Sequence, residues 1–218
     1  MLGQLLRNVS NELFGHSNTR VDSHANIPSV HRRWLLGGLL IVGGVGLVAV
    51  ATRRPKVGEK TRLLLIGDSL AVGLNTHMRE MATDEGVDAY DGKGIVGSRI
   101  DQWARDPWLD EELAAFAPNL ILVSLGTNDE ALGPGADAHQ AAALETLMEK
   151  LRATGAEIVW IGPPSLPFPR AGVSDMIRSE APYYFASETL EIPRGPDGLH
   201  PTAAGYAGWA GAIWRWLS

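Results

Sequence analysis

The stretch RLLLIGDSL, residues 62–70, joins a short apolar run to a serine. Residues 63–66 have the length and composition of a buried strand, and Gly67 and Asp68 end it. In open α/β folds, the residues that follow a strand at its carboxyl end meet the ligand. Ser69 is therefore the first candidate for chemistry in this chain of 218 residues.

Apolar runs and helical segments alternate from here to the C-terminus. The patterns predict strands at 63–66, 87–90, 120–125 and 157–161, and helices at 70–85, 99–103, 111–116, 138–154 and 202–217. Continuous apolar strands between helices indicate an α/β fold whose parallel sheet is covered on both faces. A fifth strand is expected within 184–192, at 184–186 or at 190–192.

Two loops contain clusters of glycine or proline. Residues 92–97 are expected to form a glycine loop after the second strand. Residues 162–184 contain five prolines, and we expect a long loop with one short helix near 173–179. Because this loop follows the carboxyl end of a strand, it is expected to wall the site.

A serine hydroxyl is a weak nucleophile that needs an adjacent base, normally a histidine oriented by a carboxylate. His77 and His139 fall within predicted helices and are interpreted as solvent-facing. His200 lies three residues after Asp197, in a loop before the last helix. Residues 197–200 also fit a simple turn before a helix. Together with Ser69, however, they indicate a general base, His200, and a carboxylate that orients it, Asp197.

Ester or amide hydrolysis also needs hydrogen-bond donors for a developing oxyanion, and each is worth about 3–4 kcal/mol. The candidates are the backbone N–H of Ser69, a backbone N–H within 94–97, and the side-chain amide of Asn128. Asn128 follows the strand at 120–125, so it is expected at the same sheet edge as Ser69. Asp129 is interpreted as a helix N-cap or a loop-stabilising residue without a catalytic role.

Four segments together resemble the conserved blocks of the SGNH/GDSL hydrolase family, which are named for Ser, Gly, Asn and His. They are GDSL at 67–70, GIVGS at 94–98, GTND at 126–129 and DGLHP at 197–201, in the order of the family. The resemblance covers nearly all of residues 62–218. It implies a three-layer α/β/α sandwich with a five-stranded, parallel, flavodoxin-like sheet.

The resemblance also implies a role for individual residues. It assigns Ser69 as nucleophile, Asp197 and His200 as the rest of the triad, and Ser69, Gly97 and Asn128 as the oxyanion hole. Gly94 is the alternative to Gly97 in its block. The family includes lipases, thioesterases, acetylesterases and glycan deacetylases. This chemistry requires neither a metal nor a cofactor, and none is expected.

Residues 34–52, WLLGGLLIVGGVGLVAVAT, carry no charge and have an arginine pair on each side. About 20 apolar residues cross a bilayer as a helix, so we expect a single transmembrane helix. The expected layout is a polar arm at 1–33, the helix at 34–52, a linker at 53–61 and the hydrolase domain at 62–218. The alternatives are a signal sequence cleaved near Ala51, which would make the protein secreted, and a buried core helix. Basic residues on both sides leave the orientation undetermined.

Composition excludes several other classes. The net charge of −6 argues against a nucleic-acid binder held by phosphate contacts. The absence of cysteine excludes disulfides, thiolate metal sites and cysteine nucleophiles.

Three further residues lie near the predicted oxyanion loop. Trp103 and Trp108 would either stack on a sugar ring or be buried, and burial is the commoner use. Arg99 would either meet an anionic substrate group or form a surface salt bridge.

The sequence therefore predicts a membrane-anchored serine esterase. Its expected substrate is a small ester or an acylated glycan, with an acetyl group on a cell-envelope glycan preferred because the domain has no large insertion. Acyl transfer to a sugar hydroxyl is one alternative. The other is a structural or assembly protein of a phage particle or a larger membrane-associated complex, with the N-terminal arm packed in it.

Overall fold

The computed structural model describes residues 53–218. Its strands are β1 (Arg62–Gly67), β2 (Ala89–Gly94), β3 (Leu120–Ser124), β4 (Glu157–Ile161) and β5 (Tyr183–Phe185). Its α-helices are α1 (Ser69–Asp84), α2 (Ile100–Arg105), α3 (Pro107–Phe116), α4 (Thr127–Glu130), α5 (Ala136–Ala153), α6 (Val173–Glu180) and α7 (Ala203–Leu217). A 3₁₀ turn, η1, covers Ser187–Thr189.

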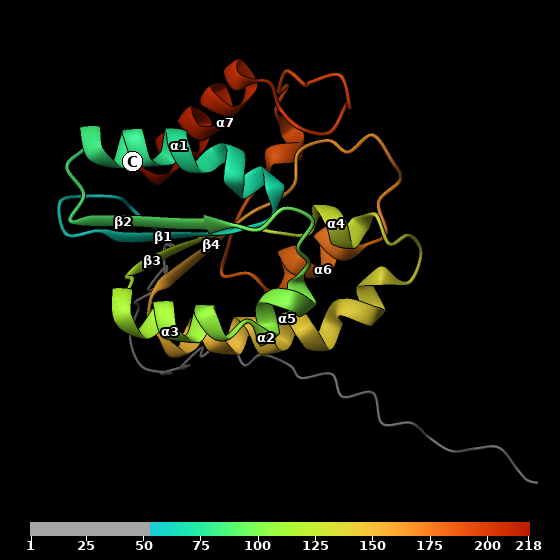
Figure 1. The fold of residues 1–218 in the computed structure, drawn as a ribbon, viewed down its shortest axis with the longest axis horizontal. Coiled ribbons are helices and arrows are strands. Elements are labelled where there is room, and N and C mark those ends of the chain that lie inside the picture. Colours follow the sequence, from blue (N-terminus) through green and yellow to red (C-terminus); the bar gives the residue numbers. More distant parts are fainter. Residues whose placement is uncertain (1–52) are drawn as a thin grey trace, which may run out of the picture. The chain divides into compact units, whose positions relative to one another are not determined.

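The strands form one parallel sheet in the order β2-β1-β3-β4-β5. After β1 the chain turns to one side to make β2, and then returns to make β3 on the other side of β1 (Figure 1). The order of the strands therefore reverses between β1 and β3. In open α/β sheets, ligands bind outside the carboxyl ends of the strands at such a reversal. Ser69 follows β1 and Asn128 follows β3, so both residues lie beside this point.

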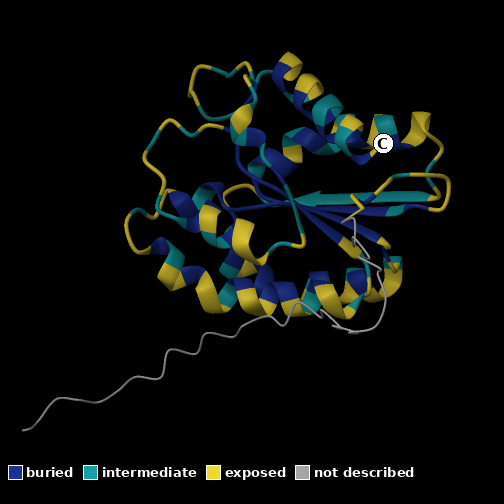
Figure 2. Ribbon diagram, turned by 180° about the vertical axis from the view of Figure 1, so that it is seen from behind, coloured by how far each residue is buried: buried dark blue, intermediate teal, exposed yellow. Residues whose placement is uncertain are grey.

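Helices cover both faces of the sheet (Figure 1). Leu63 and Leu65 belong to a core that includes residues of α1 and α7, whereas Leu64 and Ile66 belong to a core with α2, α3, α5 and α6. This alternation follows from the two-residue period of a strand. Figure 2 shows β1, β3 and β4 as a largely buried middle layer and β2 as half-buried, with exposed residues along the outer faces of the helices.

The predicted five-stranded parallel sheet is confirmed, and β5 begins one residue before the first candidate segment at 184–186. The expected helix near 173–179 corresponds to α6. The segment 190–192, the other candidate for the fifth strand, is not a strand.

The prediction for the second strand was wrong by several residues. It was expected at 87–90, before a glycine loop at 92–97, but β2 spans 89–94 and includes Gly92 and Gly94. Both glycines are needed because α1 packs closely on this strand. A Cβ at Gly92 would lie 2.4 Å from Oδ1 of Asn75, and one at Gly94 would lie 2.5 Å from Cγ2 of Val72.

Residues 53–61, the expected linker, lie against the amino ends of the strands. The Val57 N–H donates to the carbonyl of Leu217 (3.0 Å), and Nδ2 of Asn119 donates to the carbonyl of Lys60 (2.8 Å). The Arg54 guanidinium lies 5.3 Å from the ring centroid of Trp216. These contacts hold the segment at the end of the sheet opposite Ser69.

Within residues 53–218, no helix is both long and apolar enough to cross a bilayer. The predicted transmembrane helix at 34–52 and the polar arm at 1–33 lie outside the described residues.

Candidate active site

Ser69 is the first residue of α1 and follows a sharp turn at the end of β1. Gly67 permits the close approach of β3 at this point, because a Cβ there would lie 2.1 Å from the carbonyl oxygen of Ser124. Asp68 caps α1, since its Oδ1 accepts from the N–H of Leu70 (2.9 Å). The backbone N–H of Ser69, as the first of the helix, has no intrahelical acceptor. The segment thus presents both the hydroxyl and the N–H of Ser69 at the sheet edge.

Asp197 and His200 share a tight loop before α7. Oδ1 of Asp197 accepts from the N–H groups of Leu199 (2.9 Å) and His200 (3.0 Å). Its Oδ2 lies 2.7 Å from Nδ1 of His200, and Nε2 of His200 lies 2.9 Å from Oγ of Ser69. The structure therefore brings the predicted serine, histidine and aspartate into one hydrogen-bonded chain.

The charge on Asp197 determines which histidine nitrogen carries the proton. The hydrogen bond from His200, followed by those from two backbone N–H groups, lowers the pKa of Asp197 to about 2. The carboxylate is therefore ionised at neutral pH and accepts from Nδ1–H of His200. In the neutral imidazole, Nε2 is then left to accept the hydroxyl proton of Ser69. This is the orientation that a general base requires.

Asn128 lies in α4, just beyond the carboxyl end of β3. Its Nδ2 donates to the carbonyl of Ser98 at 2.9 Å. An amide nitrogen has two hydrogens, so this bond fixes the side chain and leaves one donor available. Asn128 is therefore held against the loop that contains Gly97.

Gly97 and Gly94 occupy different environments. Gly94 ends β2 and pairs with Gly67 of β1, whereas Gly97 lies in the following loop with a φ of +76°. Such a φ is readily available only to glycine. Within the part of the chain that the structure describes, the N–H of Gly97 donates to no other group. It is thus a donor available to a ligand.

Two buried carboxyl groups lie beneath this surface. Asp68 and Asp129 are both 0% exposed, and burial raises their pKa values to about 7 and about 6. Asp129 accepts from the N–H of Ile100 (3.2 Å), which agrees with its predicted loop-stabilising role. Oδ2 of Asp68 is buried without a hydrogen-bond partner among the described residues. No role for Asp68 was predicted from the sequence, because its burial depends on segments that are distant along the chain.

The structure also decides between the alternatives for Trp103 and Arg99. Trp103 is 1% exposed and donates its Nε1–H to Oγ of Ser98 (2.9 Å), so sugar stacking by Trp103 was the wrong alternative. Trp108 is partly buried against Trp103, and the Lys93 ammonium lies 3.8 Å from its ring centroid. Nε of Arg99 lies 3.3 Å from Oδ1 of Asp101, as the salt-bridge alternative predicted.

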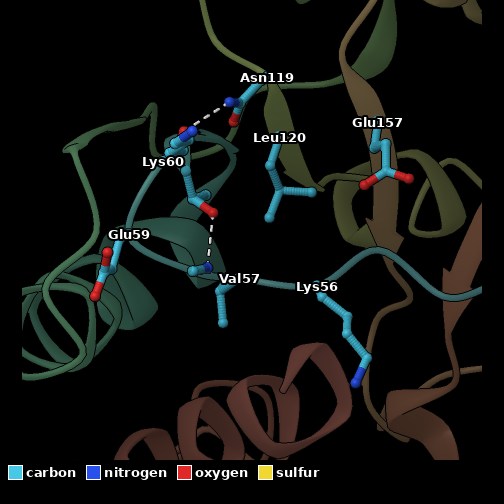
Figure 3. Close-up of a pocket in the computed structure, with 9 residues that line it drawn as sticks. Lys56, Val57, Glu59, Lys60, Asn119, Leu120 and Glu157 are labelled. Atoms are coloured by element: carbon cyan, nitrogen blue, oxygen red, sulfur yellow. Dashed lines mark hydrogen bonds between the residues drawn. The ribbon is translucent and has the colours of Figure 1, made fainter.

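A pocket of about 700 Å³ lies elsewhere, at the amino ends of the strands (Figure 3). Its walls include Lys56, Lys60, Asn119 and Glu157. Since Ser69 lies at the opposite, carboxyl end of the sheet, this pocket is not part of the candidate site. Within residues 53–218, no group of three or more acidic or histidine side chains is arranged to hold a metal ion.

A hydrogen-bonded Ser–His–Asp chain at the carboxyl edge of a parallel sheet is the arrangement of side chains that serine hydrolases use. Residues 65–207 match the model of the GDSL-like Lipase/Acylhydrolase family. The chain belongs to this family and is a hydrolase of ester bonds.

Several solved structures share the fold of this chain. The crystal structure of TesA matches with a TM-score of 0.57 and 25% identity, over 72% of this chain and 97% of that chain. The psychrotrophic esterase EstA from Pseudoalteromonas sp. matches with a TM-score of 0.59 and 19% identity, over 71% and 95%. The acetylxylan esterase Axe2 from Geobacillus stearothermophilus matches with a TM-score of 0.59 and 19% identity, over 75% and 96%. A search of curated protein sequences found no match.

Proposed function

We propose that Ser69, His200 and Asp197 form the catalytic triad of a serine esterase. Oγ of Ser69 attacks the ester carbonyl carbon while Nε2 of His200 takes its proton. The tetrahedral intermediate then collapses, and the alcohol leaves with the proton from Nε2. Water, activated by the same nitrogen, hydrolyses the acyl-enzyme and restores Ser69. The observation that carries this proposal is the chain of contacts of 2.9 Å and 2.7 Å through His200.

The oxyanion hole is proposed to consist of the N–H groups of Ser69 and Gly97 and the side-chain amide of Asn128. The helical position of Ser69, the positive φ of Gly97 and the fixed amide of Asn128 support these three donors. Gly94 is less suitable because it lies within the sheet. Donors that are already oriented stabilise developing charge without reorganisation during the reaction.

The proposed substrate is a small acyl ester of a bulky alcohol, such as an acetyl group on a glycan. The side chains of His200 and Asp197 are 40% and 52% exposed, so the histidine side of the site is open to solvent. An open edge can accept a large alcohol. Two of the neighbours in structure, AlAXEase and Axe2, are described as acetyl xylan esterases. The same open edge could admit a sugar hydroxyl in place of water, which would make the reaction an acyl transfer.

We also propose that residues 34–52 anchor the protein in a membrane. Residues 53–61, which follow this segment directly, are bound at the amino end of the sheet. Helix α7 runs from the His200 loop to this end, and its 15 residues span about 22 Å. An anchor would thus be connected to the domain at the end of the sheet remote from Ser69. The side of the membrane is testable by protease protection in intact vesicles.

The test of the proposed activity is hydrolysis of p-nitrophenyl acetate by the full chain in detergent. We expect turnover by the wild type and by Ser179→Ala, an exposed serine of α6, and none above background by Ser69→Ala. Equal turnover by the wild type and Ser69→Ala would refute the proposed nucleophile. Product analysis with a glycan acceptor separates hydrolysis from transfer, because only transfer yields an acylated glycan.

A further inference from the structure

Arg194 belongs to one of two loops that flank the candidate site and contacts the other. One is the loop that contains Asp197 and His200. The other is residues 162–172, called here the 162–172 loop, which follows β4. Nη1 of Arg194 donates to the carbonyl of Leu199, and Nη2 donates to the carbonyl of Ser165 at 2.9 Å. One guanidinium group therefore links the histidine loop to the neighbouring wall.

The histidine loop is closed by its own backbone hydrogen bonds. The N–H of Gly195 donates to the carbonyl of His200 (2.8 Å), and that of Thr202 donates to the carbonyl of Pro193 (2.9 Å). These bonds shape the loop but do not attach it to the rest of the domain. Asp197 and His200 are about half exposed, so little packing surrounds their side chains. An attachment of this loop to a neighbouring segment is therefore needed to hold His200 at a constant distance from Ser69.

Arg194 has the properties of such an attachment. Its guanidinium is partly buried, and this burial lowers the pKa of Arg194, while the nearby Tyr206 and Asp197 oppose the change. The planar guanidinium can donate to two acceptors in fixed directions at once. The carbonyl acceptors carry no charge of their own, so the bonds restrain geometry without neutralising Asp197.

The 162–172 loop is itself held at its other end. The carboxylate of Glu130 accepts from the N–H of Ala171 and from the N–H of Ser174 (2.7 Å). Glu130 lies two residues after Asn128 in α4. The loop therefore provides a fixed support for Arg194.

We propose that Arg194 is a positioning residue, which holds the Asp197–His200 loop so that Nε2 of His200 stays within reach of Oγ of Ser69 during turnover. The inference rests on the proposed function of the triad. Displacement of a catalytic group by about 1 Å costs on the order of 100-fold in rate. Both terminal nitrogens of Arg194 already donate to backbone carbonyls, so its loss is expected to reduce kcat and to leave KM nearly unchanged.

The experiment compares Arg194→Met, Arg194→Lys and the control Arg105→Met in the full-length protein. Arg105 is a surface residue whose side chain is 73% exposed and paired with Asp101. For Arg194→Met we expect kcat for p-nitrophenyl acetate to fall by about 10- to 100-fold, with KM within about threefold of the wild type. Arg194→Lys, which keeps the charge and a donor but lacks the rigid fork of a guanidinium, should recover part of kcat. Arg105→Met should match the wild type.

A spectroscopic readout separates positioning from general stability. The proton between Nδ1 of His200 and Asp197 should give a low-field ¹H resonance in the wild type, in Arg105→Met and in Ser69→Ala. We expect this resonance to broaden or disappear in Arg194→Met at a temperature well below its unfolding midpoint. Unchanged kcat and an unchanged resonance in Arg194→Met would overturn the inference, as would a fall confined to KM.

If Arg194→Met does not fold, Arg194→Lys decides alone, and a kcat equal to that of the wild type overturns the inference. Failure of the proposed function has a different signature. In that case Ser69→Ala retains activity, whereas failure of this inference alone leaves Ser69→Ala inactive and the Arg194 variants fully active.

Discussion

The ring of Tyr206 in α7 occupies the space beside Gly73 in α1, where a Cβ would lie 2.0 Å from Cζ of Tyr206. Gly73 is one helical turn beyond Ser69, and Tyr206 lies in the first turns of the helix that follows His200. This contact lets the nucleophile helix and the helix after the histidine loop approach closely. It thereby limits the separation between Ser69 and the loop that contains Asp197 and His200.

Gly73→Ala should destabilise the protein and lower its activity. The added methyl group forces apart a packed contact, which costs about 1–3 kcal/mol in the free energy of unfolding. Gly208→Ala in α7 is the matched control, because nothing lies within 4 Å of the position that a Cβ would take there. At this position the better helix propensity of alanine should stabilise the protein by up to about 1 kcal/mol. Urea unfolding measures both changes, and an equally stable Gly73→Ala would contradict the role of the contact.

Asp68→Asn should change the pH dependence of stability. Burial raises the pKa of Asp68 from 3.8 to about 7 in the folded protein. Between these pH values the folded state keeps a proton that the unfolded state releases. The free energy of unfolding therefore falls as pH rises, by at most about 1.4 kcal/mol per pH unit. Asparagine does not titrate, so Asp68→Asn should not show this fall in the free energy of unfolding.

The stability of Asp68→Asn relative to the wild type should thus increase from about pH 4 to about pH 7 and then level off. Urea unfolding at several pH values measures the difference. Asp84→Asn, at the exposed end of α1, serves as the control and should show no such increase. A constant difference between Asp68→Asn and the wild type would show that Asp68 stays ionised in the folded protein.

Asn128→Ala should reduce kcat by about 100- to 1000-fold, the usual effect of removing one oxyanion donor. KM should change little, because the lost interaction forms with the developing charge. The bond from Nδ2 of Asn128 to the carbonyl of Ser98 is also lost, which should cost about 1 kcal/mol of stability. Steady-state kinetics and thermal unfolding separate the two effects, and an unchanged kcat would exclude Asn128 from the oxyanion hole.

Glu130→Ala should loosen the 162–172 loop and the start of α6. The carboxylate is 1% exposed and accepts from both the N–H and the hydroxyl of Ser174, so its removal leaves buried donors unpaired. The expected loss is about 3 kcal/mol in the free energy of unfolding. Glu145→Ala, on the exposed face of α5, should be nearly neutral. In Glu130→Ala, the loss of amide protection against hydrogen exchange, relative to the wild type, should be confined to residues 171–177. An equal loss of protection across all segments would contradict this prediction.

The apolar strands of the sheet could be predicted well because burial on both faces leaves a continuous signal. β4 has the predicted bounds, and β3 ends one residue early. β2 was misplaced because its sequence AYDGKG is half-buried throughout and has no apolar run. Its glycines were interpreted as loop residues, whereas they are small because α1 lies against them. A glycine in a loop and a glycine in a strand that a helix packs against cannot be distinguished by residue type alone.

The motifs allowed Ser69, Asp197 and His200 to be placed at one sheet edge, and the structure brings them within hydrogen-bond distance. The roles of Asp68 and Arg194 were not visible in the sequence. Arg194 contacts the carbonyl of Ser165, 29 residues away, and the burial of Asp68 depends on several distant segments. Such contacts have no local pattern that a sequence motif can reveal.

Covalent labelling of the nucleophile tests the central claim most directly. Diethyl p-nitrophenyl phosphate should phosphorylate one serine per chain, release one equivalent of p-nitrophenol and abolish esterase activity. Peptide mapping by mass spectrometry should locate the diethylphosphoryl group on Ser69, and His200→Ala should react far more slowly. Activity that survives labelling, or a stoichiometric label on another serine, would contradict the proposed triad.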